Sequence, residues 1–402
     1  MEPEITLFSV IMLLGAAHGL FLALALINTK NDSGTGHFFL ALLTVAFAID
    51  LGHEFLYQSY YLLNILMIAY IDPVINLLYG PSYYLYVRVL TEGVTFRLKG
   101  KTWLHFLPIG IGVAICLLLP ELNQEQFTKL FYEDELASTQ EENTVQSAIN
   151  AIALASVISI GSYLALSIRR LIRHARLIRQ QFSSIERITL NWLRNLLIAL
   201  SVLYFVLIFD GFFSQTFGFD ENINNLLYLL IVIVIYTMGY LGLRQPTIFK
   251  KIPLDIDNNE ENNKEDINAD HKYKTSSLDA EMSAALQMEL QHHMKTESPH
   301  LDSKLTLSQL ANQLDISSNY LSQVINEQFN KNFFDFINDY RIEEAKRMLA
   351  DTTKADLSIA SIAYEAGFNS KSAFYTAFKK HVGITPSKFR TSATQPFSKT
   401  ST

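Results

Sequence analysis

The chain has 402 residues, a formal net charge of −7 and 49% hydrophobic residues, which is enough for two or three domains. Its apolar residues are concentrated in runs that end near Leu243, and an ordinary polar composition begins at Pro246. The single cysteine, Cys116, lies inside an apolar run, which excludes both a disulfide framework and a cysteine-based zinc site.

The N-terminal part contains seven apolar segments, each near the roughly 20 residues needed to cross a bilayer. They are Ile5–Ile27, Phe38–Tyr57, Tyr61–Leu90, Trp103–Leu119, Val145–Ile168, Trp192–Phe213 and Ile223–Leu243. A large soluble helical core is the alternative, but seven such runs would leave it almost no polar face. The first segment lacks the positive start of a signal peptide. We therefore expect an all-α, seven-helix transmembrane domain over residues 1–245.

Basic residues are concentrated in alternate loops, which sets the expected orientation in a bacterial inner membrane. The segment 169–187 carries six arginines and should be a cytoplasmic loop beside anionic lipid, although a direct contact with DNA is an alternative. The segment 121–142 holds seven acidic residues against Lys129 and should lie outside. The N-terminus is then outside, and the C-terminal part is cytoplasmic.

Four polar side chains within the apolar segments are candidates for binding a signal. Asp50, His53 and Glu54 share one helical face by their spacing, and Asp72 lies in the next segment. Because charges in hydrocarbon are costly, they are often functional. We expect an outward-open cavity for an unknown small ligand that is cationic or hydrogen-bonding, with a metal as a lesser alternative. The competing interpretation is that these groups are helix-end or packing residues.

A tether is expected between the two halves of the chain. Residues 255–270 contain seven acidic residues, five asparagines and one lysine, a composition that cannot form a core. We expect a disordered acidic linker over 246–277 and a disordered tail over 393–402. Residues 278–300 have helical apolar spacing and predict an amphipathic coupling helix. One interpretation is that this helix packs on the next domain. The alternative is that it pairs two protomers or relays the membrane signal.

Residues 305–329 predict two short helices joined by a tight turn. Thr306 followed by Gln309 is typical of a capping box that starts the first helix. Ser317 can cap the second helix, whose outer face is rich in amides and hydroxyls. Two helices of this kind, the second with a polar outer face, have the geometry that enters a major groove of DNA.

The same pattern returns over residues 358–390. Gly367 supplies the turn, and Ser370 caps a second helix that directs Phe374 and Phe378 inward. Between the two units, Phe333–Leu349 predicts one amphipathic helix roughly 25 Å long at 1.5 Å per residue. Such a helix can hold two recognition helices near successive major-groove faces.

The motifs of this region resemble the signature of the AraC/XylS family of transcription activators. They are Gly367-Phe368, Phe374, Phe378-Lys379, Gly383, Pro386 and Arg390, within a domain expected over 301–392. The resemblance implies a double helix-turn-helix domain that reads bases with Asn319, Ser322, Gln323, Lys371, Ser372, Tyr375 and Thr376. Asp315 departs from the glycine usual in the first unit, but aspartate tolerates a left-handed turn. Gln323 and Thr376 stand where arginine is common, and glutamine favours adenine over guanine.

Charge distinguishes the two helix-turn-helix units. Residues 301–365 contain six basic and ten acidic residues, whereas residues 366–402 contain six basic and no acidic residues. We expect the second unit to supply most phosphate contacts. The candidates are Lys379, Lys380, Lys388 and Arg390. A monomer should bind weakly, so a homodimer or clustering in the membrane should help.

The sequence therefore indicates a membrane-integrated one-component transcription regulator, with double-stranded DNA, the lipid bilayer and RNA polymerase as partners. A transporter or channel with a regulatory DNA-binding tail is the alternative, but the Pro73 and Pro81 breaks occur in one span only, without the counterpart that inverted repeats supply. No phosphate-binding glycine loop, nucleophile elbow or metalloprotease helix occurs. We expect no catalytic residues, cofactor or metal.

Overall fold

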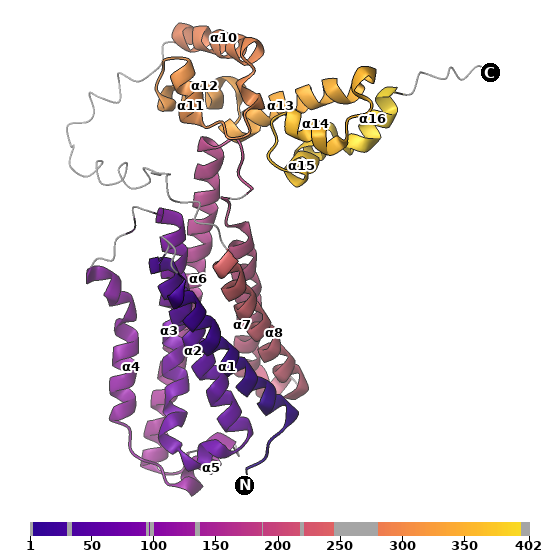
Figure 1. Cartoon of the computed structure of the whole chain (residues 1–402). Coiled ribbons are helices and arrows are strands. Elements are labelled where there is room, and N and C mark those ends of the chain that lie inside the picture. The colour runs from indigo at the N-terminus through magenta and orange to yellow at the C-terminus, as the bar shows by residue number, and fades with distance from the viewer. Residues whose placement is uncertain are drawn as a thin grey trace, which may run out of the picture. The chain divides into compact units, whose positions relative to one another are not determined.

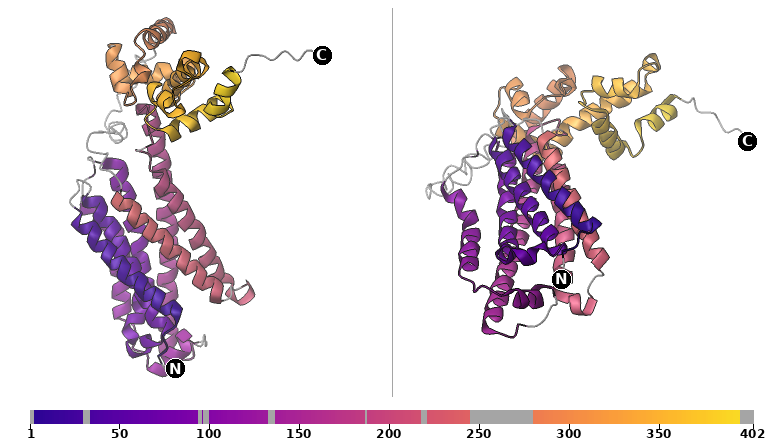
Figure 2. Two further views of the ribbon diagram at one scale, coloured as in Figure 1. Left: turned by 45° about the vertical axis from the view of Figure 1, so that its right-hand side comes forward. Right: turned by 60° about the horizontal axis from the view of Figure 1, so that its bottom comes forward.

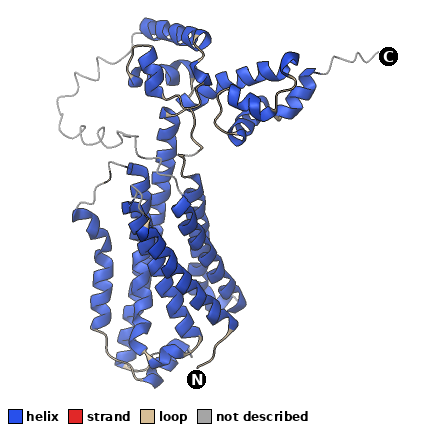
Figure 3. Cartoon of the chain, viewed as in Figure 1, coloured by secondary structure: helices blue, strands red, loops and turns tan. Residues whose placement is uncertain are grey.

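The computed structural model describes residues 3–29, 34–93, 96, 100–132, 137–186, 188–217, 221–244 and 280–394. Every named element within these ranges is a helix, as Figure 3 shows, so the all-α class is confirmed for the described part of the chain. The chain divides into two compact units. The first comprises residues 1–172 and 190–256, and the second comprises 173–189 and 257–402. The expected acidic linker and most of the expected tail lie outside the described residues.

The first unit is a bundle whose long helices lie alongside one another (Figure 1). Its helices are α1 (Leu7–Asn28), α2 (Gly34–Gln58), α3 (Ile71–Glu92), α4 (Leu107–Leu117), α5 (Gln124–Tyr132), α6 (Gln140–Gln181), α7 (Asn191–Phe217) and α8 (Glu221–Arg244). Among the described residues, four helices are long and apolar enough to cross a membrane: Leu7–Asn28, Thr35–Gln58, Gly100–Leu117 and Gln140–Gln181. Asn191–Val206 and Tyr228–Leu243 are apolar but shorter. The expected seven spans are therefore not confirmed.

The interior of the first unit is formed mainly by α2 and α3. Phe39, Leu40, Leu85 and Tyr86 are almost fully buried there. Gly80 lets α3 pass close to α6, because a Cβ at this position would lie 2.6 Å from a ring carbon of Tyr163. Small residues such as glycine allow helices to approach closely, and they are common where helices pack in membrane proteins.

One end of α3 is tied to α6 by buried charges. The Glu92 carboxylate, 6% exposed, accepts a hydrogen bond from Arg88 at 2.7 Å and a second from Arg170. Arg170 also donates to the Thr91 hydroxyl at 2.7 Å. Because buried charges are stable only when they are paired, this cluster holds the two helix ends together.

The arginine-rich segment differs from the expected loop, because α6 continues through it for 42 residues and ends at Gln181. No glycine or proline follows Gly161 before the helix ends, and arginine, leucine, isoleucine and glutamine favour a helix. Residues 140–172 of α6 belong to the first unit, and residues 173–181 belong to the second. The sequence alone did not predict this division.

The second unit contains seven α-helices within the described residues. They are α10 (Ala280–Thr296), α11 (Leu307–Gln313), α12 (Ser318–Phe329), α13 (Phe333–Ala350), α14 (Ile359–Glu365), α15 (Lys371–Val382) and α16 (Pro386–Thr394). Figures 1 and 2 show α10, α11 and α12 grouped at one end of α13 and α14, α15 and α16 at the other. The side chains of Thr306, Ser317, Ser358 and Ser370 cap α11, α12, α14 and α15. These caps satisfy backbone N–H groups that a helix start leaves without partners.

Each half of α13 supports a separate hydrophobic core. Phe333, Phe336 and Ile337 join the core of the first helix-turn-helix pair, which also contains Leu290 and Met294 of α10. The second half of α13 contributes Ile342, Ala345, Met348 and Leu349 to the core with α14 and α15. The contacts of α10 support the interpretation in which residues 278–300 pack on the helix-turn-helix domain.

The two helix-turn-helix turns use left-handed backbone conformations. Asp315 has φ 54°, as expected for a residue that replaces glycine there. Gly367 has φ 87°, and a Cβ at this position would lie 2.4 Å from the carbonyl oxygen of His300. Only glycine fits at this second turn, because both the conformation and the close approach exclude a side chain.

A buried histidine predicts acid sensitivity of the second unit. His300 is 3% exposed, and burial, with the nearby Arg341 charge, lowers its pKa from 6.5 to about 4. The unfolded chain therefore takes up a proton near pH 6.5 that the folded chain refuses until about pH 4. We expect this contribution to stability to be present above pH 6.5 and to be lost between pH 6.5 and 4. The urea midpoint of the full chain should fall as the pH is lowered from 6.5 to 4, and His300→Phe should reduce this dependence on pH. If the midpoint of the variant falls as steeply with pH as that of the unchanged protein, the assignment to His300 is contradicted.

Candidate nucleic-acid interface and ligand cavity

The outer face of α12 presents the first set of predicted base-reading residues. Asn319 is exposed, and Ser322 and Gln323 are half-buried at the edge of the same face. The Gln323 side-chain amide donates to the Glu327 carboxylate at 2.9 Å. In the absence of DNA, the amide of Gln323 is thus engaged with an acidic neighbour on its own helix.

This contact predicts that Glu327 weakens DNA binding. Removing its carboxylate eliminates repulsion from phosphates and frees the Gln323 amide, so Glu327→Ala should tighten DNA binding by about threefold to fivefold, the size of one surface charge interaction. Fluorescence anisotropy of the full chain in nanodiscs, with Glu344→Ala as a control on α13, would measure it. Weaker binding by Glu327→Ala would instead indicate that Glu327 holds Gln323 in its reading position.

The outer face of α15 presents the second set. Lys371, Ser372 and Thr376 are exposed, and Tyr375 is half-buried. The Lys371 ammonium lies 5.5 Å from the centre of the Tyr375 ring, which is within cation–π range. Phe374 and Phe378 point into the core and fix the side of α15 that faces outward.

The four predicted phosphate ligands fall into two groups. Lys379 and Lys388 are exposed. Lys380 is also exposed, but its ammonium lies 3.0 Å from the Asp335 carboxylate of α13. Arg390 is half-buried, and its guanidinium donates to the Leu357 carbonyl at 2.8 Å. The structure therefore gives Lys380 and Arg390 internal contacts that the sequence did not reveal.

The four predicted signal-binding residues of the first unit line one cavity of about 550 Å³. Asp50, His53 and Glu54 reach it from α2, and Asp72 reaches it from α3. Sequence analysis missed the aromatic lining, because tyrosines in apolar runs resemble packing residues. This lining consists of Phe47, Tyr57, Tyr79, Tyr83, Tyr204 and Tyr228. A volume of this size is typical of small-molecule sites.

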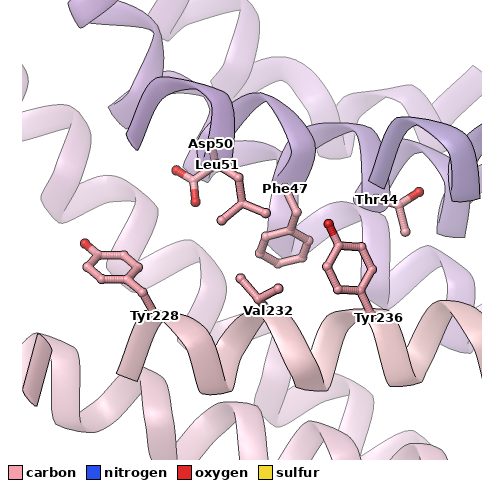
Figure 4. A pocket seen from close by; sticks show the side chains of 7 residues that line it. All are labelled: Thr44, Phe47, Asp50, Leu51, Tyr228, Val232 and Tyr236. Carbon is pink, nitrogen blue, oxygen red and sulfur yellow. The ribbon is translucent and has the colours of Figure 1, made fainter. Parts of the chain in front are cut away.

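A much smaller pocket of about 20 Å³ adjoins this cavity and shares Phe47, Asp50, Leu51 and Tyr228 with it. Figure 4 shows it between α2 and α8, where Tyr228, Val232 and Tyr236 face the α2 side chains. Asp50 therefore lies at a junction of α2, α3 and α8. A movement of any of these helices would change the surroundings of its carboxylate.

The second unit also contains a buried arginine that sequence analysis did not single out. Arg341, on α13, is fully buried and donates to the carbonyl oxygens of His300 at 2.8 Å, Ser183 at 2.7 Å and Asp302 at 2.8 Å. It also donates to the Ser183 hydroxyl at 2.9 Å. Burial lowers the pKa of Arg341 to about 10, so the guanidinium remains charged at neutral pH. In the sequence, Arg341 lies four residues after Ile337 and four before Ala345, and this helical spacing indicates that it is buried.

The family that matches covers the C-terminal part of the chain. Residues 310–392 match the family described as a helix-turn-helix domain. The melibiose operon regulatory protein of Escherichia coli is 34% identical over 89 residues, which are 22% of this chain and 28% of that protein. An uncharacterized transcriptional regulator of Bacillus subtilis, YtdP, is 34% identical over 22% of this chain and 11% of its own length. The chain thus spans less than a third of the length of each of these relatives.

One solved structure that matches is the C-terminal domain of the two-component response regulator yesN from Fusobacterium nucleatum. It is 36% identical over 26% of this chain and 98% of its own length, with a TM-score of 0.24. The matched residues include the two turns, the caps of α12, α14 and α15, and α13. Residues 310–392 therefore belong to the helix-turn-helix family and form an AraC-type domain.

Proposed function

We propose that the chain is a membrane-integrated, one-component transcription regulator that binds double-stranded DNA through α12 and α15. The observation that carries this proposal is the pair of helix-turn-helix units on one strut, each with a polar outer face on its second helix. At 18 residues, α13 is roughly 27 Å long, which suits readers of successive major-groove faces. RNA polymerase and a second copy of the chain are the expected partners at a promoter.

The first unit is proposed to lie in the bacterial inner membrane. Large apolar side chains are exposed on several of its helices, including Phe21 at 70%, Ile158 at 61% and Phe205 at 68%. Large apolar side chains exposed on helix after helix are unusual for a protein surface in water, whereas lipid covers them without cost. Together with the four helices of spanning length, this exposure supports membrane integration.

The proposed orientation places the N-terminus outside and the helix-turn-helix domain in the cytoplasm. The acidic segment 121–142 is then external, and the basic end of α6 is internal. Reporter enzymes fused after residue 130 should be active outside the cytoplasm, and fusions after residue 260 should be active inside. A cytoplasmic signal from the fusion after residue 130 would refute this orientation.

Mapping the DNA bound by the full chain in cells tests the regulatory proposal. We expect discrete promoter sites that are recovered with the membrane fraction, and a Gln323→Ala, Lys371→Ala double variant should lose them. A matched variant, Gln291→Ala, Lys295→Ala, changes the same residue types on α10 and should retain the sites. Absence of discrete sites in cells that express the folded protein would refute sequence-specific regulation.

A further inference from the structure

The cavity of the first unit combines unbalanced negative charge with aromatic walls. Three carboxylates line it, from Asp50, Glu54 and Asp72, and no lysine or arginine is among its lining residues that the structure describes. His53 also lines the cavity, and its Nδ1 lies 3.9 Å from the Asp72 carboxylate. The first unit therefore holds more negative than positive charge around this space.

The polar groups of the same cavity are incompletely paired among the described residues. The Tyr79 side chain is buried, and its hydroxyl contacts the Asp50 carboxyl. The Nε2 atom of His53 is buried without a hydrogen-bond partner among the described residues. Because buried polar groups in proteins are nearly always paired, this nitrogen indicates that a polar ligand completes the site.

We propose that this cavity binds an organic cation, an amine or quaternary ammonium compound whose apolar part contacts the tyrosine rings. Carboxylates neutralise its charge, and the faces of Tyr79, Tyr204 and Tyr228 offer cation–π contacts. No group of three or more histidine, cysteine or acidic ligands among the described residues is arranged to hold a metal. The volume of about 550 Å³ also exceeds what a bare ion fills. This inference rests on the proposed sensing role of the first unit.

Choline and its neutral isostere 3,3-dimethylbutan-1-ol provide a matched test. We expect choline to raise the thermal unfolding temperature of the full chain in nanodiscs, and the alcohol to have no effect at equal concentration. Asp72→Asn should weaken choline binding by about tenfold or more, equivalent to one lost charge contact. Glu125→Gln, an exposed change on α5 outside the cavity, should bind choline normally.

Three outcomes would overturn the inference: equal stabilisation by the neutral alcohol, stabilisation only by Mg²⁺ or Na⁺, or no effect of choline. DNA binding by the same nanodisc preparation separates this failure from that of the proposed function. If DNA binding is retained while choline has no effect, the cation assignment fails and the regulator proposal stands. If DNA binding is absent from a folded preparation, the regulator proposal fails first.

A second inference concerns the docking segment, which we define as residues 179–186 at the end of α6 and in the turn after it. It belongs to the same unit as the helix-turn-helix domain. Phe182 forms an antiparallel bridge with Thr306, and the Ser183 N–H and hydroxyl donate to the Leu305 carbonyl at 3.2 Å and 2.6 Å. The docking segment is therefore hydrogen-bonded to the start of α11.

The docking segment also completes the coordination of Arg341. Ser183 supplies two of the four acceptors that surround the buried guanidinium. Arg341 follows Ile337 of the first core and precedes Ile342 of the second, so it lies where α13 passes from one core to the other. Displacing Ser183 would leave a buried charge short of partners at this junction, which is costly.

Continuity of α6 connects this contact with the ligand cavity. Ser156, Ile160 and Leu164 of α6 line the cavity, and the helix runs without a break to Gln181, inside the docking segment. A rigid helix that has two arrangements can carry energetic coupling between sites. We infer that the docking segment transmits ligand occupancy to the helix-turn-helix domain by altering the hydrogen bonds between Ser183 and Arg341.

Adjacent serines provide a matched test of this coupling. Ser183→Ala removes the hydroxyl bonds to Leu305 and Arg341, whereas Ser184→Ala changes the neighbouring serine, which is only half-buried. In the full chain in nanodiscs, we expect Ser183→Ala to change DNA affinity by at least threefold, equivalent to about 0.7 kcal/mol, and Ser184→Ala to leave it unchanged. Equal affinities for all three proteins would overturn the inference.

A reversible cross-link gives an independent measurement. Residues opposite each other in an antiparallel bridge have Cα atoms about 4.5–5.5 Å apart, which suits a disulfide. In a chain with Cys116→Ala, the Phe182→Cys, Thr306→Cys pair should therefore oxidise readily. In the oxidised protein, we expect DNA affinity to be the same with and without a substitution of Asp72 in the cavity. In the reduced protein, the substitution of Asp72 should change DNA affinity. Failure to cross-link, or an identical response in both redox states, would contradict transmission through the docking segment.

Discussion

Replacing Arg341 with alanine is expected to lower the free energy of unfolding of the second unit by about 3–5 kcal/mol, because buried acceptors lose their charged donor. The carbonyl groups concerned belong to Ser183, His300 and Asp302, and each would remain in the interior without this partner. Arg341→Lys should restore only part of the loss, since an ammonium cannot reproduce the planar fork of a guanidinium. Pulse proteolysis of the full chain in nanodiscs across a urea series measures these differences.

Arg347→Ala is the matched control for this prediction. Arg347 lies on the same helix, its side chain is 73% exposed, and it pairs with Glu344 three residues earlier. Loss of such a surface pair should change stability by less than about 0.5 kcal/mol. If both variants lowered the free energy of unfolding by a similar amount, the loss for Arg341→Ala would not come from the hydrogen bonds of its buried guanidinium.

The helix-turn-helix half could be predicted from the sequence because its signals are local. Thr306 and Gln309 form the expected capping box, and Ser317 and Ser370 cap α12 and α15 as expected. Asp315 adopts the left-handed conformation that its side chain tolerates. Each of these signals needs only neighbours within a few residues, so no knowledge of tertiary contacts was required.

The remaining parts of the candidate sites depend on contacts between distant residues. Ser183 and Arg341 are 158 positions apart, and no periodicity relates a polar turn after α6 to the middle of α13. The ion pair of Lys380 with Asp335 joins two helices across 45 positions. In the first unit, spacing predicted that Asp50, His53 and Glu54 share a face, and the cavity contains all three. Except for Tyr57, its tyrosine walls come from three other helices, α3, α7 and α8, which spacing within α2 cannot reveal.

The two recognition helices are expected to contribute differently to DNA binding. Gln323→Ala on α12 should weaken binding to the preferred site by about 1–3 kcal/mol, and should relax base preference at one or two positions, because a reading amide is lost. Binding to scrambled DNA should be unchanged. Anisotropy titrations of the full chain in nanodiscs on both DNAs would detect this difference.

Lys379→Ala on α15 should instead weaken binding to every sequence and lower the magnitude of the salt slope by about one unit, as expected for one lost phosphate contact. Lys380 is the matched neighbour, since its ammonium is held 3.0 Å from Asp335. The sequence predicts the same phosphate role for both lysines, whereas the ion pair predicts a smaller change in slope for Lys380→Ala. If both variants lower the slope equally, the Lys380–Asp335 pair must open when DNA binds, and α13 must then present a free carboxylate close to the phosphates. Asp335→Asn would in that case tighten binding to all sequences, and the salt titration of this variant distinguishes a pair that opens from one that persists.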